Sequence, residues 1–78
     1  MTFEKVKKII VDTLNLKNPD VVTMDSHLVD DLGADSLDAA EIIMSLEDEF
    51  GISVDDDKIQ TIKYVKDLVN AIDTELNK

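Results

Sequence analysis

Apolar side chains recur at steps of three and four residues in three separate segments of this 78-residue chain. That spacing puts each set on one face of an α-helix, whereas a half-buried strand would alternate every second residue. The pattern predicts helices over residues 3–14, 36–50 and 65–76. Turn-forming residues lie between them, at 15–20 and at Gly51. We therefore expect an all-α fold, a small bundle of three main helices plus short helical turns.

The length of the chain allows one hydrophobic core, so we expect a single domain over residues 1–78. There is no cysteine, so any thiol chemistry must use a sulfur supplied by another group. No apolar run approaches the roughly 20 residues that span a bilayer, and residues 1–5 do not resemble a signal peptide. We expect a cytoplasmic monomer that does not insert into membranes.

Residues 16–34 form a long connection for a small domain, so we expect this segment to pack or to function. A single helical turn within it is predicted to pin the connection onto the core, with Asp25 or Ser26 as its cap. The apolar residues of this turn are Leu28, Val29 and Leu32. After Gly51, a second short segment starts at residues 55–57 and can point Ile59 and Ile62 inward.

Charge is distributed unevenly along the chain, whose formal net charge is −10. Residues 18–57 hold thirteen acids and no lysine, while the remaining residues hold five acids and eight lysines. An acidic surface of this kind repels nucleic acid and anionic lipid, and it steers basic partners into encounter. We therefore expect protein partners with basic docking patches and no nucleic-acid partner.

The start of the second predicted helix has the strongest local signal. Asp35 is a favourable N-cap residue, and the Asp38 carboxylate can reach back to a free backbone N–H group. Ser36 then falls at the first helical position, at the positive end of the helix dipole. A phosphate ester on its hydroxyl would be stabilised there, because helix N-termini favour anions.

Residues 30–38, Asp-Asp-Leu-Gly-Ala-Asp-Ser-Leu-Asp, together with the helix that follows, resemble the acyl carrier proteins of dissociated (type II) bacterial fatty-acid synthesis. The resemblance covers nearly the whole chain. It implies that Ser36 carries 4′-phosphopantetheine, transferred from coenzyme A by a phosphopantetheinyl transferase. It also implies that Asp35 and Asp38 contact the transferase or its magnesium ion. On this reading the chain has no catalytic residue or resident metal, and it shuttles acyl thioesters between the enzymes of fatty-acid biosynthesis.

The predicted helix over residues 36–50 has two distinct sides at 100° per residue. One side is assigned to the core and consists of Ala39, Ile42, Ile43, Leu46 and Phe50. The other side places apolar groups among carboxylates, and its residues match the surface that carriers offer to partner enzymes. We expect this docking face to comprise Leu37, Ala40, Glu41, Met44, Glu47 and Asp48.

One segment departs from the family's pattern. Residues 52–59 contain no proline and are shorter than the corresponding segment of the family, so the resemblance does not establish a small third helix there. The pathway also stays open at this point, because a carrier for polyketide, D-alanyl or another specialised acyl pathway would use the same chemistry at Ser36.

Two other classes of function fit the sequence poorly. The only histidine, His27, adjoins Ser26, and neighbouring residues rarely achieve the geometry of a nucleophile and its base. We expect His27 to be a partly exposed loop residue. A calcium loop starting at Asp31 would need glycine at its sixth position and glutamate at its twelfth, where this chain has Ser36 and Ile42.

Overall fold

The computed structural model describes residues 2–77, and Met1 and Lys78 lie outside the described residues. Within that range all regular elements are helical, which confirms the predicted all-α class. In chain order they are α1 (Thr2–Leu14), the 3₁₀ turn η1 (Pro19–Val21), α2 (Ser36–Phe50), α3 (Asp56–Thr61) and α4 (Val65–Leu76). The three predicted main helices are present, and only the start of α1 differs, by one residue.

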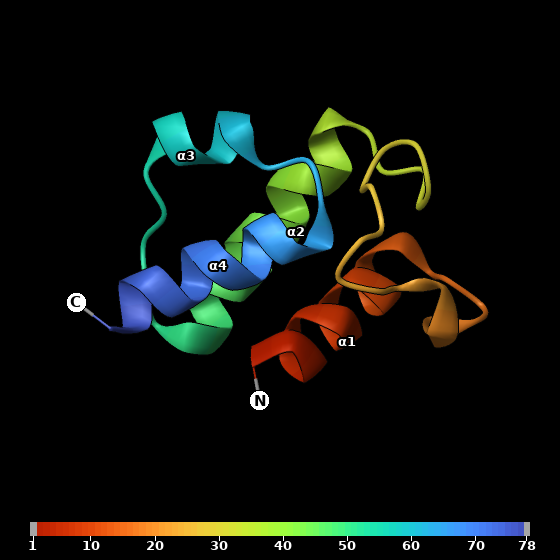
Figure 1. Cartoon of the computed structure of the whole chain (residues 1–78), viewed down its shortest axis with the longest axis horizontal. Helices are drawn as coiled ribbons and strands as arrows, with labels where there is room; N and C mark the ends of the chain where they lie inside the picture. Colours follow the sequence, from red (N-terminus) through yellow and green to blue (C-terminus); the bar gives the residue numbers. More distant parts are fainter. Residues whose placement is uncertain (1, 78) are drawn as a thin grey trace.

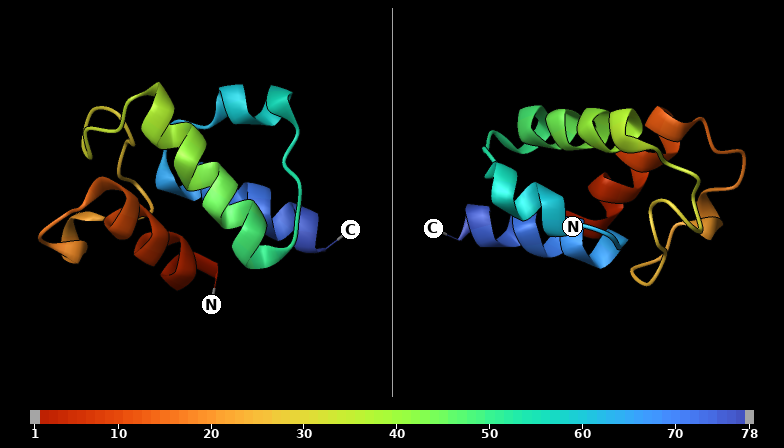
Figure 2. Two further views of the ribbon diagram at one scale, coloured as in Figure 1. Left: turned by 180° about the vertical axis from the view of Figure 1, so that it is seen from behind. Right: turned by 90° about the horizontal axis from the view of Figure 1, so that it is seen from above.

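The three long helices α1, α2 and α4 pack against one another, and each contacts the other two (Figure 1). The short helix α3 lies on the side of α2 and α4 that is remote from α1 (Figure 2). None of the helices in the described range is long and apolar enough to cross a membrane. The connection between α1 and α2 lies beside the C-terminal end of α1 and the N-terminal end of α2 (Figure 1).

The hydrophobic core draws on the three long helices and also on the connection between α1 and α2. Its buried members are Val6, Ile10, Val22, Leu28, Leu32, Ala34, Ile42, Ile43, Leu46, Val65, Leu68, Val69 and Ile72. Two residues assigned to the core, Ala39 and Phe50, are only partly buried. Phe50 is the last residue of α2, and its ring packs at the edge of the core with the Lys5 ammonium 5.5 Å from its centroid.

The connection from α1 to α2 is held by local hydrogen bonds as well as by its buried residues. Asn15 ends α1 in the left-handed region at φ 54°. The buried Ser26 donates its hydroxyl to the Val21 carbonyl at 2.9 Å and accepts the Thr23 N–H at 3.0 Å. These bonds close the loop that follows η1, so Ser26 has a structural role in this segment.

A helical turn follows at residues 27–32, as expected, with Leu28 and Leu32 buried and Val29 54% exposed. The predicted cap, however, was wrong. Neither Asp25 nor Ser26 caps this turn, because the Ser26 hydroxyl bonds to residues before it. The cap is His27, whose Nδ1 accepts the backbone N–H groups of the second and third residues after it, at 3.2 and 3.1 Å.

The same loop pairs through its backbone with the residues that lead into α4. Leu28 N–H donates to the Lys63 carbonyl at 2.9 Å, and Val65 N–H donates to the Ser26 carbonyl at 3.0 Å. His27 and Tyr64 form an isolated antiparallel bridge between these bonds. The two segments are far apart in sequence, so this pairing fixes the loop to the start of α4.

The small helix α3 forms despite the short segment that precedes it. The Glu47 carboxylate accepts the Val54 N–H at 2.8 Å, which anchors the chain between α2 and α3. Ile59 and Ile62 pack against the core from α3 and its end, as predicted. The Lys58 ammonium nitrogen lies 4.0 Å from a carboxylate oxygen of Glu75 in α4. These contacts hold α3 even though its N-cap, Asp55, makes no side-chain capping bond.

Asp67 fixes the start of α4 through its carboxylate, which accepts the N–H groups of Tyr64 at 3.0 Å and Lys63 at 3.1 Å. The bond from Tyr64 is the main cause that lowers the pKa of Asp67 below its usual value. A carboxyl group with a lowered pKa in the folded state contributes stability above the pKa of the unfolded chain. That contribution is lost as the pH falls through the folded value.

We therefore expect Asp67→Ala to lower the free energy of unfolding at pH 7 by about 1 kcal/mol or less, because both bonds are lost at a partly exposed site. The difference from the native chain should shrink as the pH is lowered from 5 towards 3. Urea unfolding followed by circular dichroism at several pH values measures it. A difference that stays constant over this range would contradict the role of the ionised carboxylate.

Candidate functional site

The N-terminus of α2 is built by two aspartates that bond to each other's backbone. Asp38 N–H donates to Oδ1 of Asp35 at 2.8 Å, and Asp35 N–H donates to Oδ2 of Asp38 at 3.3 Å. Asp35 has extended backbone angles, as an N-cap residue requires. This is the reciprocal arrangement expected from the sequence, and it fixes the residue at which the helix begins.

Ser36 is the first residue of α2 and is exposed. The capping bonds occupy the N–H groups of Asp35 and Asp38, but the N–H groups of the first helical residues have no acceptor inside the helix. Together with the helix dipole, they favour an anion beside the Ser36 hydroxyl. The nearby carboxylates oppose this effect, and their repulsion is weakened by solvent because both aspartates lie at the surface.

The chain reaches Asp35 through a short segment that leaves it little freedom. Gly33 has φ 75°, a left-handed conformation that glycine adopts without strain. Its N–H donates to the Val29 carbonyl at 3.0 Å, and Ala34 N–H donates to the Leu28 carbonyl at 2.9 Å. Ala34 is buried. The turn at residues 27–32 and the start of α2 are therefore joined by direct hydrogen bonds.

The predicted docking face lies mostly on the exposed side of α2. Leu37 is 75% exposed and Met44 is 64% exposed, so two apolar side chains stand out from the helix. Ala40, Glu41 and Asp48 are also exposed. Glu47 differs from the other members because it is partly buried and its carboxylate bonds to the backbone after α2. It lies at the edge of the face, where 100° per residue also places it, but its bond to the Val54 N–H is not revealed by the helical period.

Outside the start of α2, two further kinds of site were weighed within the described residues: a Ser26–His27 catalytic pair and a metal-binding cluster. His27 is partly exposed, as expected, and its Nδ1 accepts backbone N–H groups, while the Ser26 hydroxyl donates to a backbone carbonyl. The two side chains are thus committed to separate partners and do not form a nucleophile and base. Within residues 2–77, no cluster of three metal-ligating side chains is arranged to hold an ion.

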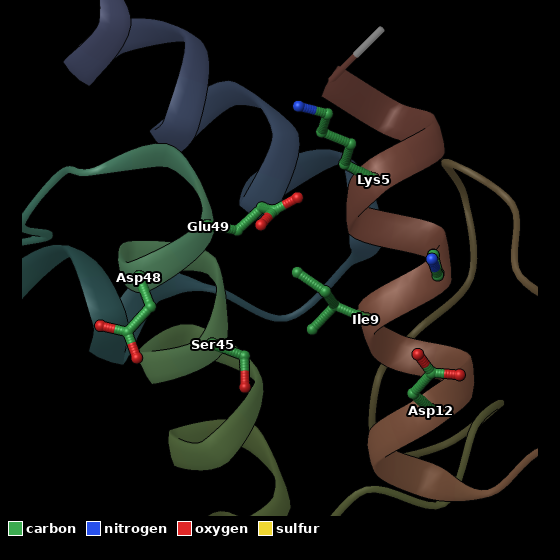
Figure 3. Close-up of a pocket in the computed structure, with 7 residues that line it drawn as sticks. Lys5, Ile9, Asp12, Ser45, Asp48 and Glu49 are labelled. Carbon is green, nitrogen blue, oxygen red and sulfur yellow. The ribbon is translucent and has the colours of Figure 1, made fainter.

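An open groove of about 410 Å³ lies between α1 and α2 (Figure 3). It is lined by Lys5, Lys8, Ile9, Asp12, Ser45, Asp48 and Glu49. Its lining mixes acidic and basic side chains from two helices and does not include Ser36. We therefore place the candidate functional site at the start of α2 and along its exposed face, which shares only Asp48 with the lining of this groove.

Comparison with known proteins shows the family of the chain. Residues 4–72 match the protein family described as a phosphopantetheine attachment site. The chain belongs to this family. Phosphopantetheine is the prosthetic group of this family, and the chain is a carrier protein.

The relatives and a solved structure are consistent with one class of carrier. The chain is 47% identical over 75 residues to an acyl carrier protein of Petrotoga mobilis, covering 96% of this chain and 87% of that protein. It is 47% identical over 72 residues to an acyl carrier protein of Zymomonas mobilis, covering 92% and 91%. A Mycobacterium tuberculosis structure assigned as an acyl carrier protein superposes with a TM-score of 0.89 at 34% identity, covering 95% of this chain and 97% of that one.

The capping pair at the start of α2 can be tested by its effect on stability. Replacing Asp35 by alanine should lower the free energy of unfolding by about 1 kcal/mol, because the N–H of Asp38 loses its acceptor. Asp35→Asn keeps an acceptor oxygen and should lose much less. Urea unfolding of the three proteins at neutral pH measures both effects. Equal stability of the alanine variant and the native chain would contradict the capping role.

Proposed function

We propose that the Ser36 hydroxyl is the attachment point of 4′-phosphopantetheine and that the chain carries growing fatty acyl groups as thioesters on this arm. The observation that carries the proposal is an exposed serine at the first helical residue of α2, within a chain that matches a phosphopantetheine attachment family. The relatives named acyl carrier protein support the acyl cargo.

The residues around Ser36 fit the proposed group. Modification forms a bond between Ser36 Oγ and phosphorus and breaks the pyrophosphate bond of coenzyme A, and adenosine 3′,5′-bisphosphate leaves as the serine proton is lost. The first-turn N–H groups of α2 would then face the phosphate. The bound group supplies a thiol, which the cysteine-free chain does not have. Asp35 and Asp38 each use one oxygen for capping, and the second oxygen of each would contact the transferase or its magnesium ion.

The exposed face of α2 would serve a series of enzymes in turn. Leu37 and Met44 offer apolar contacts, and Met adapts well to partners of different shape. The surrounding carboxylates, including Glu41 and Asp48, would attract basic docking patches and raise association rates. We propose that these docking events take place in the cytoplasm and that the chain acts as a monomer, moving between the enzymes of fatty-acid biosynthesis.

The proposal is tested by intact mass after incubation with coenzyme A and a broad-specificity phosphopantetheinyl transferase. The native chain should gain one phosphopantetheine, and Ser36→Ala should gain none. Ser45→Ala is the matched control, because Ser45 is an exposed serine of the same helix and its loss should leave the gain unchanged. Modification of the Ser36→Ala variant, or failure of the native chain to gain mass, would overturn the assignment.

The pathway needs a separate measurement. Adding the modified chain to purified enzymes of bacterial fatty-acid synthesis, in place of their own carrier, should restore chain elongation. Absence of elongation with a fully modified chain would assign the protein to a different acyl pathway while leaving the attachment at Ser36 intact.

A further inference from the structure

His27 holds the turn that precedes the attachment site through an unprotonated ring nitrogen. Its Nδ1 accepts the N–H of Val29 at 3.2 Å and the N–H of Asp30 at 3.1 Å. A nitrogen that accepts hydrogen bonds carries no proton, so the neutral ring must have its hydrogen on Nε2. The Asp31 carboxylate completes the arrangement by accepting the N–H of His27 at 2.7 Å.

The turn capped by His27 is connected directly to the start of α2. The His27 carbonyl accepts the N–H groups of Asp31 at 2.9 Å and Leu32 at 3.1 Å. The next bonds, from Gly33 and Ala34 back to this turn, bring the chain to the residue that caps α2. An opening of the turn would therefore release the segment that leads to Ser36.

The ring of His27 also contacts the segment that begins α4. It meets the Tyr64 ring edge to face, with centroids 5.0 Å apart and planes at 79°. The Lys66 ammonium lies 5.3 Å from the centroid of the Tyr64 ring and 3.9 Å from the Asp25 carboxylate. His27 is thus shared by the turn before α2 and the start of α4.

We propose that His27 is a positioning residue whose neutral imidazole closes the turn before Ser36, and that its protonation opens this turn and slows modification of Ser36. Protonation would turn Nδ1 from an acceptor into a donor, so both capping bonds would be lost. The effect on Ser36 rests on the proposed function, whereas the capping itself does not.

The charged groups around His27 oppose this opening only weakly. On its own turn, the Asp30 carboxylate lies 3.9 Å from Nδ1, and the Asp31 carboxylate bonds to the backbone of His27. From the α4 side, the neighbouring ionisable groups are Tyr64, Lys63, Lys66 and Asp67, with Asp25 paired to Lys66. The protonated ring would gain the Asp30 carboxylate, but the side chain of Asp30 is 79% exposed, so this ion pair is weak compared with two lost bonds.

The first experiment tests the cap in the native chain and in His27→Asn. Asparagine can accept the same two N–H groups and does not titrate, so it is the matched control. At pH 8 the ¹⁵N signals of the native imidazole should show an unprotonated Nδ1. When the pH is lowered from 8 to 5, the hydrogen-exchange protection of Val29 and Asp30 should fall about fivefold more in the native chain than in the variant. A protonated Nδ1 at pH 8, or an equal fall in both proteins, would overturn the proposal.

The second experiment tests the link to Ser36 by measuring the initial rate of modification with coenzyme A and a transferase. The ratio of the native rate to the His27→Asn rate cancels the pH dependence of the transferase. This ratio should fall severalfold from pH 8 to pH 5 as the native cap opens, and a flat ratio would overturn the link. If the protection changes as expected but neither protein is modified at any pH, the cap is supported and the proposed function is overturned.

Discussion

The packing of one stripe of α2 into the core is the interaction on which the rest of the site depends. Ile42, Ile43 and Leu46 are almost completely buried, and burial of each side chain contributes roughly 1.5–3 kcal/mol. A capping bond contributes less, about 1 kcal/mol. The stripe therefore determines how α2 is rotated, while Asp35 and Asp38 determine where it begins. Both together turn Leu37 and Met44 outward on the same helix that starts with Ser36.

The connection between α1 and α2 extends this order to the residues before Ser36. It contributes Val22, Leu28, Leu32 and Ala34 to the core, so it is a packed segment even though much of it is irregular. Its backbone pairing with residues 63–66 adds hydrogen bonds that its own turn does not supply. A flexible arm attached at Ser36 would thus start from a well-fixed base, and the movement needed to reach several enzymes would belong to the arm.

Much of the architecture could be predicted because it depends on local chemistry. The helical period gave the three long helices, and the spacing of Asp35 and Asp38 gave the capping pair. The end of α2 at Gly51 was also predictable, because glycine is the usual residue at a left-handed helix end. In the structure Gly51 has φ 66° and caps α2. Each of these features involves residues within one turn of each other.

The features that sequence reasoning missed depend on contacts between distant segments or on unusual residue types. Histidine is not among the favoured N-cap residues, so the sequence favours Asp25 or Ser26, although the cap is His27, immediately before the apolar turn. The pairing of the loop with residues 63–66 has no local pattern, because its two partners come together only in the folded chain. The helical period likewise does not predict the bond from the Val54 N–H to the Glu47 carboxylate, because Val54 lies outside the helices.

The decisive measurement for the site is which surface of α2 meets a partner enzyme. Side-chain methyl NMR signals can be followed as a phosphopantetheinyl transferase is added without coenzyme A, so that binding occurs without modification. The methyl signals of Leu37 and Met44 should shift or broaden, while those of Ile9, in the groove between α1 and α2, should not. Shifts at Ile9 with unchanged signals from Leu37 and Met44 would contradict this assignment of the docking face.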